Sequence, residues 1–151
     1  MRTRALQYLA RREYSRAELR SKLLPHVQAD EDFERSPPPS LDTLLDDLAA
    51  RGWLSDARAA TQLVHARRGR FGTQRIAHEL RQKGIAEELI GGALPALKES
   101  ELETARDVWQ KKFGALPQDA KEKARQMRFL QSRGFSLDTI FCVLRSEHDI
   151  E

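Results

Sequence analysis

The chain has 151 residues, of which 40% are hydrophobic and 32% are charged, and its formal net charge is +3. A chain of this length can bury roughly 70% of its unfolded surface, so neither disulfides nor a structural metal are needed for folding. The single cysteine excludes a disulfide within the chain, and no apolar run approaches the ~20 residues of a membrane span. The composition fits one soluble domain or a short array of repeats.

Helical periodicity dominates the first third of the chain. A helix is predicted near residues 2–11, and Ser15 with Glu18 then has the spacing of a capping box, in which each side chain accepts a backbone N–H of the other residue. Residues 25–40 contain three consecutive prolines and several acids, and they are predicted to form an inserted loop. The next helix is marked by apolar residues at i, i+3, i+4 and i+7, namely Leu41, Leu44, Leu45 and Leu48.

The same periodicity continues to the C-terminal end. Helices are predicted near residues 57–68 and 101–113, and Gly91, Gly92 and Pro95 are expected to weaken or kink the helix between them. Two further apolar stripes are Leu89, Ile90, Ala93, Leu94 and Leu97, and Leu137, Ile140, Phe141 and Leu144. The expected N-caps of the later helices are Ser40, Ser55, Thr73 and Ser136.

A short phrase, Leu-x-x-[Arg/Lys]-Gly-apolar, occurs three times, around Gly52, Gly84 and Gly134. It predicts a helix end, a glycine in the left-handed conformation and a buried apolar residue. The apolar residues are Trp53, Ile85 and Phe135, and acids follow each of them in the first turn of another helix.

Basic and acidic blocks also alternate three times along the chain. Together with the repeated phrase, this alternation predicts an all-α protein of three tandem three-helix repeats that form an elongated, curved helical array. We assign residues 1–54 to the first repeat, which carries the acidic, proline-rich insertion, residues 55–98 to the second and residues 99–151 to the third. Neighbouring repeats are expected to pack end to end, because one short repeat buries little apolar surface.

The candidate functional residues are basic and occur in all three repeats. Arginine suits phosphate or carboxylate groups in bidentate geometry, so these side chains could bind an anionic ligand if they share one surface. Alternatively, they are solvated helix faces paired with the acidic blocks. They are Arg11, Arg12 and Arg16 in the first repeat, Arg67, Arg68, Arg70, Arg75 and Lys83 in the second, and Arg125, Arg128 and Arg133 in the third.

The loop at residues 67–75 combines two glycines, Phe71, several arginines and the start of a helix. A helix N-terminus can bind anions through its free N–H groups. The loop lacks the Gly-Lys-Ser/Thr ending of a P-loop. Its alternative role is structural, with Phe71 packed in the core and the glycines shaping the turn.

No constellation for catalysis or metal binding is present in the sequence. The four histidines, His26, His65, His78 and His148, have no metal-ligand spacing, and no Gly-x-Ser-x-Gly elbow occurs. We therefore expect no enzyme activity, no cofactor and no metal. The lone Cys142 and most aromatic side chains are expected to pack in the core.

Three segments together resemble the RecX family. They are Arg4-Ala5-Leu6 with Arg12-Glu13-Tyr14-Ser15-Arg16, then Gly72-x-x-Arg75-Ile76 with Glu79-Leu80-Arg81-x-Lys83-Gly84-Ile85, then Arg128-Phe129-Leu130-x-x-Arg133-Gly134-Phe135-Ser136. Each is moderately specific, and their order in a chain of this length makes the resemblance strong. Residues 25–40 and 110–120 match the family least.

The resemblance implies three tandem three-helix repeats and a cytoplasmic, non-catalytic regulator that binds the RecA recombinase and RecA–DNA filaments. It implies inhibition of RecA's ATPase, strand exchange and coprotease activities, through blocked filament growth or filament disassembly. Direct contact with single- or double-stranded DNA is a further expectation, and we expect a monomer with no membrane partner.

Two other functions fit the same residues. The first is an autonomous DNA-binding protein with helix-turn-helix-like units, in which Thr73, Gln74, Arg75 and His78 face bases. The second is a helical scaffold that binds only protein. Steep weakening of binding by salt would indicate contacts dominated by phosphate, and binding of single-stranded DNA would exclude the second function.

Overall fold

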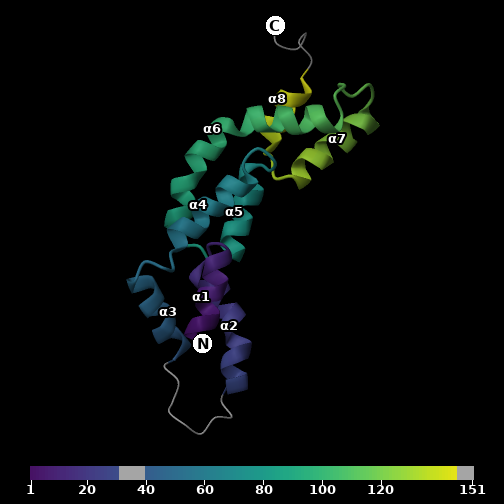
Figure 1. Cartoon of the computed structure of the whole chain (residues 1–151). Helices are drawn as coiled ribbons and strands as arrows, with labels where there is room; N and C mark the ends of the chain where they lie inside the picture. Colours follow the sequence, from purple (N-terminus) through teal and green to yellow (C-terminus); the bar gives the residue numbers. More distant parts are fainter. Residues whose placement is uncertain (31–39, 146–151) are drawn as a thin grey trace.

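The computed structural model describes residues 1–30 and 40–145, which form eight α-helices and, within these ranges, no β-strand. The helices are α1 (Arg2–Arg11), α2 (Arg16–Asp30), α3 (Leu41–Ala50), α4 (Asp56–Arg67), α5 (Thr73–Gln82), α6 (Glu87–Lys112), α7 (Ala120–Ser132) and α8 (Leu137–Leu144). Figure 1 shows an elongated, curved array with α1–α3 at one end and α7 and α8 at the other, which confirms the predicted fold class. None of the described helices is long and apolar enough to cross a membrane.

Three separate hydrophobic cores hold the array together. The first takes its buried residues from Ala5 to Leu54, the second from Ala59 to Leu97 and the third from Ala105 to Leu144. The predicted stripe of α3 lies wholly in the first core, where Leu45 and Leu48 are fully buried. Each fully buried Leu, Ile or Phe contributes roughly 1.5–3 kcal/mol, so each repeat buries its own apolar face.

The three glycine turns adopt the predicted conformation. Gly52, Gly84 and Gly134 have φ values of 75°, 75° and 91°, and in each turn the N–H two residues after the C-cap bonds the carbonyl five residues earlier, as in Trp53 N–H to Leu48 O at 3.0 Å. The prediction that Trp53 is buried is wrong, since it is 42% exposed and the next residue, Leu54, fills the core instead.

The sequence suggested that the repeated phrase marks the same position in every repeat, but the structure shows that it does not. Gly84 and Gly134 follow α5 and α7, the second helices of their repeats, whereas Gly52 follows α3, the third helix of its own. The same local turn therefore ends helices that occupy different places in the repeat, because the phrase encodes only a helix end.

Four of the expected helix starts are confirmed and one is wrong. The Ser15 N–H donates to Glu18 Oε1 at 3.0 Å and the Glu18 N–H donates to Ser15 Oγ at 3.1 Å, which completes the capping box. The hydroxyls of the other confirmed N-caps accept N–H groups of α3, α4 and α8, and these residues are Ser40, Ser55 and Ser136. Thr73 is not an N-cap, because Gly72 takes that position and Thr73 is the first helical residue.

Two predicted breaks are helical in the structure. Helix α2 continues through Pro25 to Asp30, with Val27 packed against the first core, so the predicted loop at residues 25–40 begins too early; residues 31–39 lie outside the described residues. Helix α6 runs unbroken for 26 residues across the predicted boundary at residues 98–99. It changes direction along its length (Figure 1), as expected from a proline inside a helix.

Most aromatic residues pack in or against the cores as expected, but Trp53, Phe141 and Cys142 do not. Cys142 is exposed on α8, and Phe141 beside it is 42% exposed. These positions are outside the stripe of α8 that faces α6, because Ile140, Val143 and Leu144 fill that stripe.

Candidate anion-binding interface

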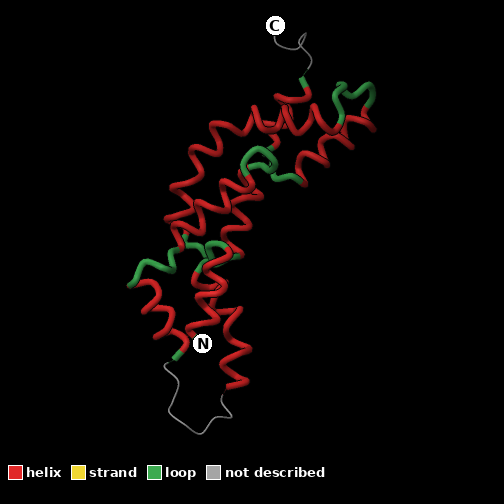
Figure 2. The backbone as a smooth tube through the Cα atoms, viewed as in Figure 1, coloured by secondary structure: helices red, strands yellow, loops and turns green. Residues whose placement is uncertain are grey.

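The second helices of successive repeats meet end to end. At the second junction, where the start of α5 meets the end of α7, the Gly72 N–H donates to the Arg133 carbonyl at 2.7 Å and the Gln74 N–H donates to the Gly134 carbonyl at 3.2 Å. Figure 2 shows the two loops side by side. The N–H groups of one helix thus meet the carbonyls of another, so the two helix dipoles align head to tail.

This close approach depends on two glycines. A Cβ on Gly72 would lie 2.3 Å from the backbone carbon of Gly134, and a Cβ on Gly134 would lie 2.3 Å from the Cβ of Arg75. Side chains at either position would push the two loops apart, so the paired glycines bring Arg75 and Arg133 to one place.

A buried carboxylate on α6 fastens the same junction. Glu101 is 8% exposed, and its Oε1 accepts the Thr73 N–H at 3.1 Å. Its Oε2 accepts the hydroxyls of Ser136 at 3.2 Å and Thr139 at 2.6 Å. The carboxylate therefore lies at the N-terminal ends of both α5 and α8, where the helix dipoles favour negative charge.

The first junction, where the start of α2 meets the end of α5, has corresponding contacts. The Ser15 hydroxyl donates to the Lys83 carbonyl at 2.5 Å, and the Arg16 N–H donates to Asp56 Oδ1 at 2.7 Å. The latter bond corresponds to that of Thr73 with Glu101, since Arg16 and Thr73 are the first residues of α2 and α5. The two junctions are thus repeats of one arrangement.

The charges of the first junction are balanced. Glu18, the third residue of α2, pairs with Arg12 at 3.0 Å and with Lys83 at 3.4 Å. Burial raises the pKa of Glu18, but hydrogen bonds from Arg12 and the Ser15 N–H, with the charges of Lys83 and Arg12, outweigh burial and leave its pKa below the ordinary range. The Arg12 guanidinium also stacks 3.6 Å from the ring centre of Tyr14.

The second junction has the opposite charge at the matching position. Arg75, the third residue of α5, takes the place of Glu18, and Arg133, the C-cap of α7, takes the place of Lys83. Phe71 takes the place of Tyr14, and the guanidinium carbons of Arg75, Arg133 and Arg70 lie 4.2, 5.3 and 5.6 Å from its ring centre. Cation–π contacts hold these guanidiniums, and the Arg75 side chain also donates to the Ser132 carbonyl at 3.1 Å.

A surface hollow of about 280 Å³ opens beside this cluster. None of the described residues that line it is acidic, and four are basic. The Lys112 ammonium and the Arg133 guanidinium lie 5.5 and 5.2 Å from the ring centre of Phe129 in its wall. The lining residues are Gly69, Arg70, Val108, Lys111, Lys112, Phe129 and Arg133.

The structure separates the eleven candidate residues into three groups. Three of them surround Phe71, as described above. Five pair with carboxylates at 2.7–3.4 Å, namely Arg12 and Lys83 with Glu18, Arg16 with Asp46, Arg67 with Glu79, and Arg125 with Glu122. The other three, Arg11, Arg68 and Arg128, are exposed and form no ion pair within the described residues.

Lys111 and Lys112 line the hollow but are not among the candidate residues predicted from the sequence. They line the hollow because α6 is continuous to Lys112 and passes over the loop at Gly69 and Arg70. The sequence shows these two lysines as a basic pair, but their place beside the hollow depends on the length of α6.

The comparisons with known proteins agree over almost the whole chain. Family models described as the second and third three-helix domains of RecX match residues 55–94 and 99–144. A protein named Regulatory protein RecX from Leptothrix cholodnii is 50% identical, covering 97% of this chain and 90% of its own, and one of the same name from Ralstonia pickettii is 39% identical, covering 99% and 89%. A crystal structure of regulatory protein RecX has a TM-score of 0.74 at 23% identity, covering 94% of this chain and 70% of the other.

Proposed function

The chain belongs to the RecX family, and on that premise we propose that it is a negative regulator of the RecA recombinase. It binds RecA and RecA–DNA filaments and inhibits ATP hydrolysis, strand exchange and coprotease activity. It acts by binding rather than catalysis, and it is a monomer in dilute solution. Its place is the cytoplasm, where it acts in recombination, repair and the SOS response.

One observation carries the molecular part of this proposal, namely the excess of unbalanced positive charge at the second junction. Arg70, Arg75 and Arg133 surround one ring, and Lys111 and Lys112 lie across the hollow. Like charges this close repel each other, and an anionic ligand removes the repulsion. We propose that this hollow receives the phosphate backbone of filament DNA or an acidic recombinase surface.

The shape of the molecule supports placement along a filament. The array is elongated and curved (Figure 1), and the hollow lies on its second and third repeats. A curved rod lodged in a helical groove covers several subunits at once. It thereby blocks the addition of subunits or favours their release, so we expect inhibition at ratios below one protein per recombinase.

The autonomous helix-turn-helix function is less well supported. Its recognition residues lie at the start of α5, where Thr73 is 7% exposed and bonded to Glu101, and where Gln74 bonds the Gly134 loop. The third repeat therefore contacts the first turn of this helix and buries Thr73, and the side chains that remain exposed for base contact are Gln74, Arg75 and His78.

The test is ATP hydrolysis by a matched RecA on single-stranded DNA, with the protein added well below equimolar amounts. We expect suppression by the natural chain and at least roughly tenfold weaker suppression by Lys111→Glu/Lys112→Glu, because two phosphate contacts are lost. The same variant should lower the salt slope of binding by about 2. The matched control is Lys98→Glu/Arg106→Glu, which makes the same charge change at exposed positions of the same helix.

Equal loss of suppression in both double variants would remove the hollow from the proposal, because only net charge would then matter. Absence of suppression by the natural chain, even in excess, would overturn the regulatory function itself. Suppression with a flat salt dependence would assign the hollow to an acidic protein face rather than to phosphate.

A further inference from the structure

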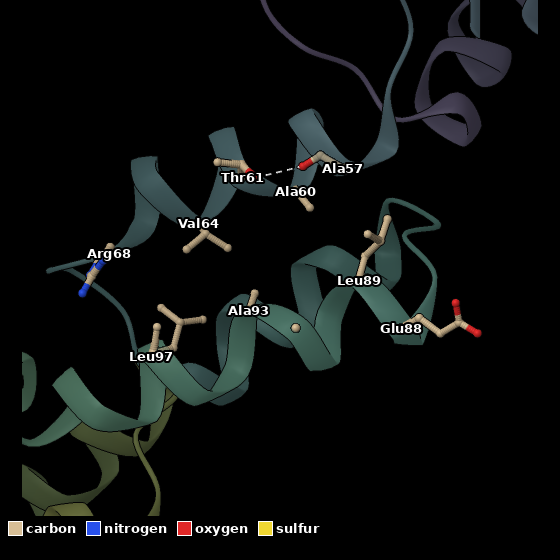
Figure 3. Close-up of a pocket in the computed structure, with 11 residues that line it drawn as sticks. Ala57, Ala60, Thr61, Val64, Arg68, Glu88, Leu89, Ala93 and Leu97 are labelled. Carbon is tan, nitrogen blue, oxygen red and sulfur yellow. Dashed lines mark hydrogen bonds between the residues drawn. The ribbon is translucent and has the colours of Figure 1, made fainter. Parts of the chain in front are cut away.

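A second depression lies on the middle repeat, away from the basic hollow. Helix α4 and the first half of α6 leave a groove of about 380 Å³ between them. Figure 3 shows Ala60 and Val64 of α4 facing Ala93 and Leu97 of α6 across it. The lining is mostly apolar and mostly small, namely Ala57, Ala60, Thr61, Val64, Arg68, Glu88, Leu89, Gly92, Ala93, Ala96 and Leu97.

The groove is kept open by a residue that weakens its own helix. Gly92 lies inside α6, lines the groove, and has nothing within 4 Å of the place where a Cβ would be. Glycine in a helix interior costs about 1 kcal/mol relative to alanine. The sequence therefore carries a local cost that no packing contact in the described residues explains, which is typical of a functional surface.

The two ends of the groove carry opposite charges. Arg68 lies at the end where α4 finishes, and Glu88 lies at the end where α6 begins (Figure 3). From Glu88 to Leu97 the wall formed by α6 is about 14 Å long, at 1.5 Å per residue. The groove thus fits a short apolar helix with an acid at one end and a base at the other.

Helix α8 of the same chain has these properties. Leu137 and Phe141, spaced i, i+4 on its outer face, are 47% and 42% exposed. Asp138 lies in the first turn of α8 and Arg145 follows its last residue, Leu144. The helix has eight residues and is about 12 Å long.

We propose that α8 of one copy of the protein docks in the groove between α4 and α6 of a second copy. The docked helix runs antiparallel to α4 and α6, with Asp138 near Arg68, Arg145 near Glu88, and Phe141 over Gly92. Antiparallel helix dipoles favour this direction, as do both charge pairs.

The contact joins two different surfaces, so a copy that donates α8 still has its own groove free. Such a heterologous contact adds copies in one direction and closes only if its rotation completes a ring. One short helix buries less than the roughly 1,200 Å² of a stable interface, so the contact is weak in dilute solution and gains strength only when copies are held close together.

The lone natural cysteine provides the test, because Cys142 is exposed on α8 beside Phe141. The donor is the natural chain, and the tagged acceptor carries Cys142→Ser with Thr61→Cys on the groove wall. A short bismaleimide should join donor and acceptor into a heterodimer. The matched acceptor with Ala66→Cys, an exposed position of α4 outside the groove, should give at least roughly fivefold less heterodimer.

A variant that fills the groove, compared with a matched variant outside it, distinguishes loss of docking from loss of folding. Gly92→Leu in the acceptor should abolish most of the heterodimer, whereas Gly91→Leu, at an equally open position of the same helix outside the groove lining, should leave it unchanged. Arg68→Glu in the acceptor should lower the yield about fivefold, and Asp138→Arg in the donor should restore it.

Equal yields from the Thr61→Cys and Ala66→Cys acceptors, or equal effects of the two leucine variants, would overturn the proposal. If Gly92→Leu weakened inhibition of RecA and left cross-linking unchanged, the groove would belong to the recombinase rather than to a second copy. The cross-linking needs no recombinase, so its result is independent of the proposed regulatory function.

Discussion

At the scale of single residues, Glu18 combines a helix cap with charge balance. Its Oε1 accepts the Ser15 N–H and its Oε2 lies near Arg12 and Lys83. Its pKa in the folded protein is below the ordinary value of 4.5, so its charge stabilises the fold above that pH, and the stabilisation is lost as pH falls through the folded pKa. Folding stability should therefore depend on pH through this residue.

We predict that Glu18→Gln lowers the free energy of unfolding by roughly 0.5–1 kcal/mol at pH 7. Glutamine keeps the capping geometry and removes only the charge. Denaturant unfolding at several pH values should show the difference shrinking as pH falls from the ordinary pKa of 4.5 through the lower pKa of the folded state. Glu99→Gln, at an exposed site of α6, is the control and should change little; a difference independent of pH would show that the loss is not electrostatic.

At the scale of elements, glycines of one chain should respond in opposite directions to the same substitution. Gly91 and Gly92 have open space around a future Cβ and lie within α6, so Gly→Ala at each should stabilise the protein by about 0.8–1 kcal/mol. Gly72→Ala should destabilise it, because the new Cβ meets the Gly134 backbone at 2.3 Å. Midpoints of denaturant unfolding measure all three.

A loss of stability in Gly91→Ala or Gly92→Ala would contradict this account of α6. It would mean that the glycines are needed for the change of direction of the helix. The proline at position 95 removes one N–H from the helix ladder in either case.

Elements were predictable from the sequence where local chemistry decides them. The capping box at Ser15 and the turn at Gly84 depend only on residues close in the chain. Helix α2 continues through Pro25 because Val27 reaches the first core, and tertiary packing of this kind overrides propensity. The sequence likewise offered no sign that Glu101, within α6, would accept hydrogen bonds from the N-terminal ends of α5 and α8.

The candidate interface was predictable as a set of basic residues but not as a site. Whether a basic residue is free depends on partners far away in the chain, such as Glu18 for Lys83. The cluster around Phe71 joins Arg70 and Arg133, which are brought together by backbone bonds between two glycine turns. Charge counting along the sequence gave equal weight to both junctions, and only their geometry distinguishes them.

At the scale of the whole molecule, separate cores make the array close to one-dimensional. The first repeat contacts the second through a junction of few polar bonds, whereas the second and third also share the continuous helix α6. The stability of the array is therefore approximately a sum of terms for each repeat and terms for each junction. Glu101 is the side chain that bonds both α5 and α8, and it therefore couples the second repeat to the third. The first repeat is coupled through Ser15, Lys83 and Asp56 and does not use Glu101.

Glu101→Ala should consequently uncouple one end of the array and leave the other intact. The buried Thr73 N–H and two hydroxyls lose their acceptor, at a cost of roughly 2–4 kcal/mol. Hydrogen exchange should show lost protection in α5, α7 and α8 with protection in α1 and α3 unchanged. The control, Glu103→Ala, changes an exposed carboxylate two residues along the same helix and should have no such effect. Equal loss of protection in all helices would show that the three repeats unfold as one cooperative unit, and the account of separate cores joined by specific junctions would then fail.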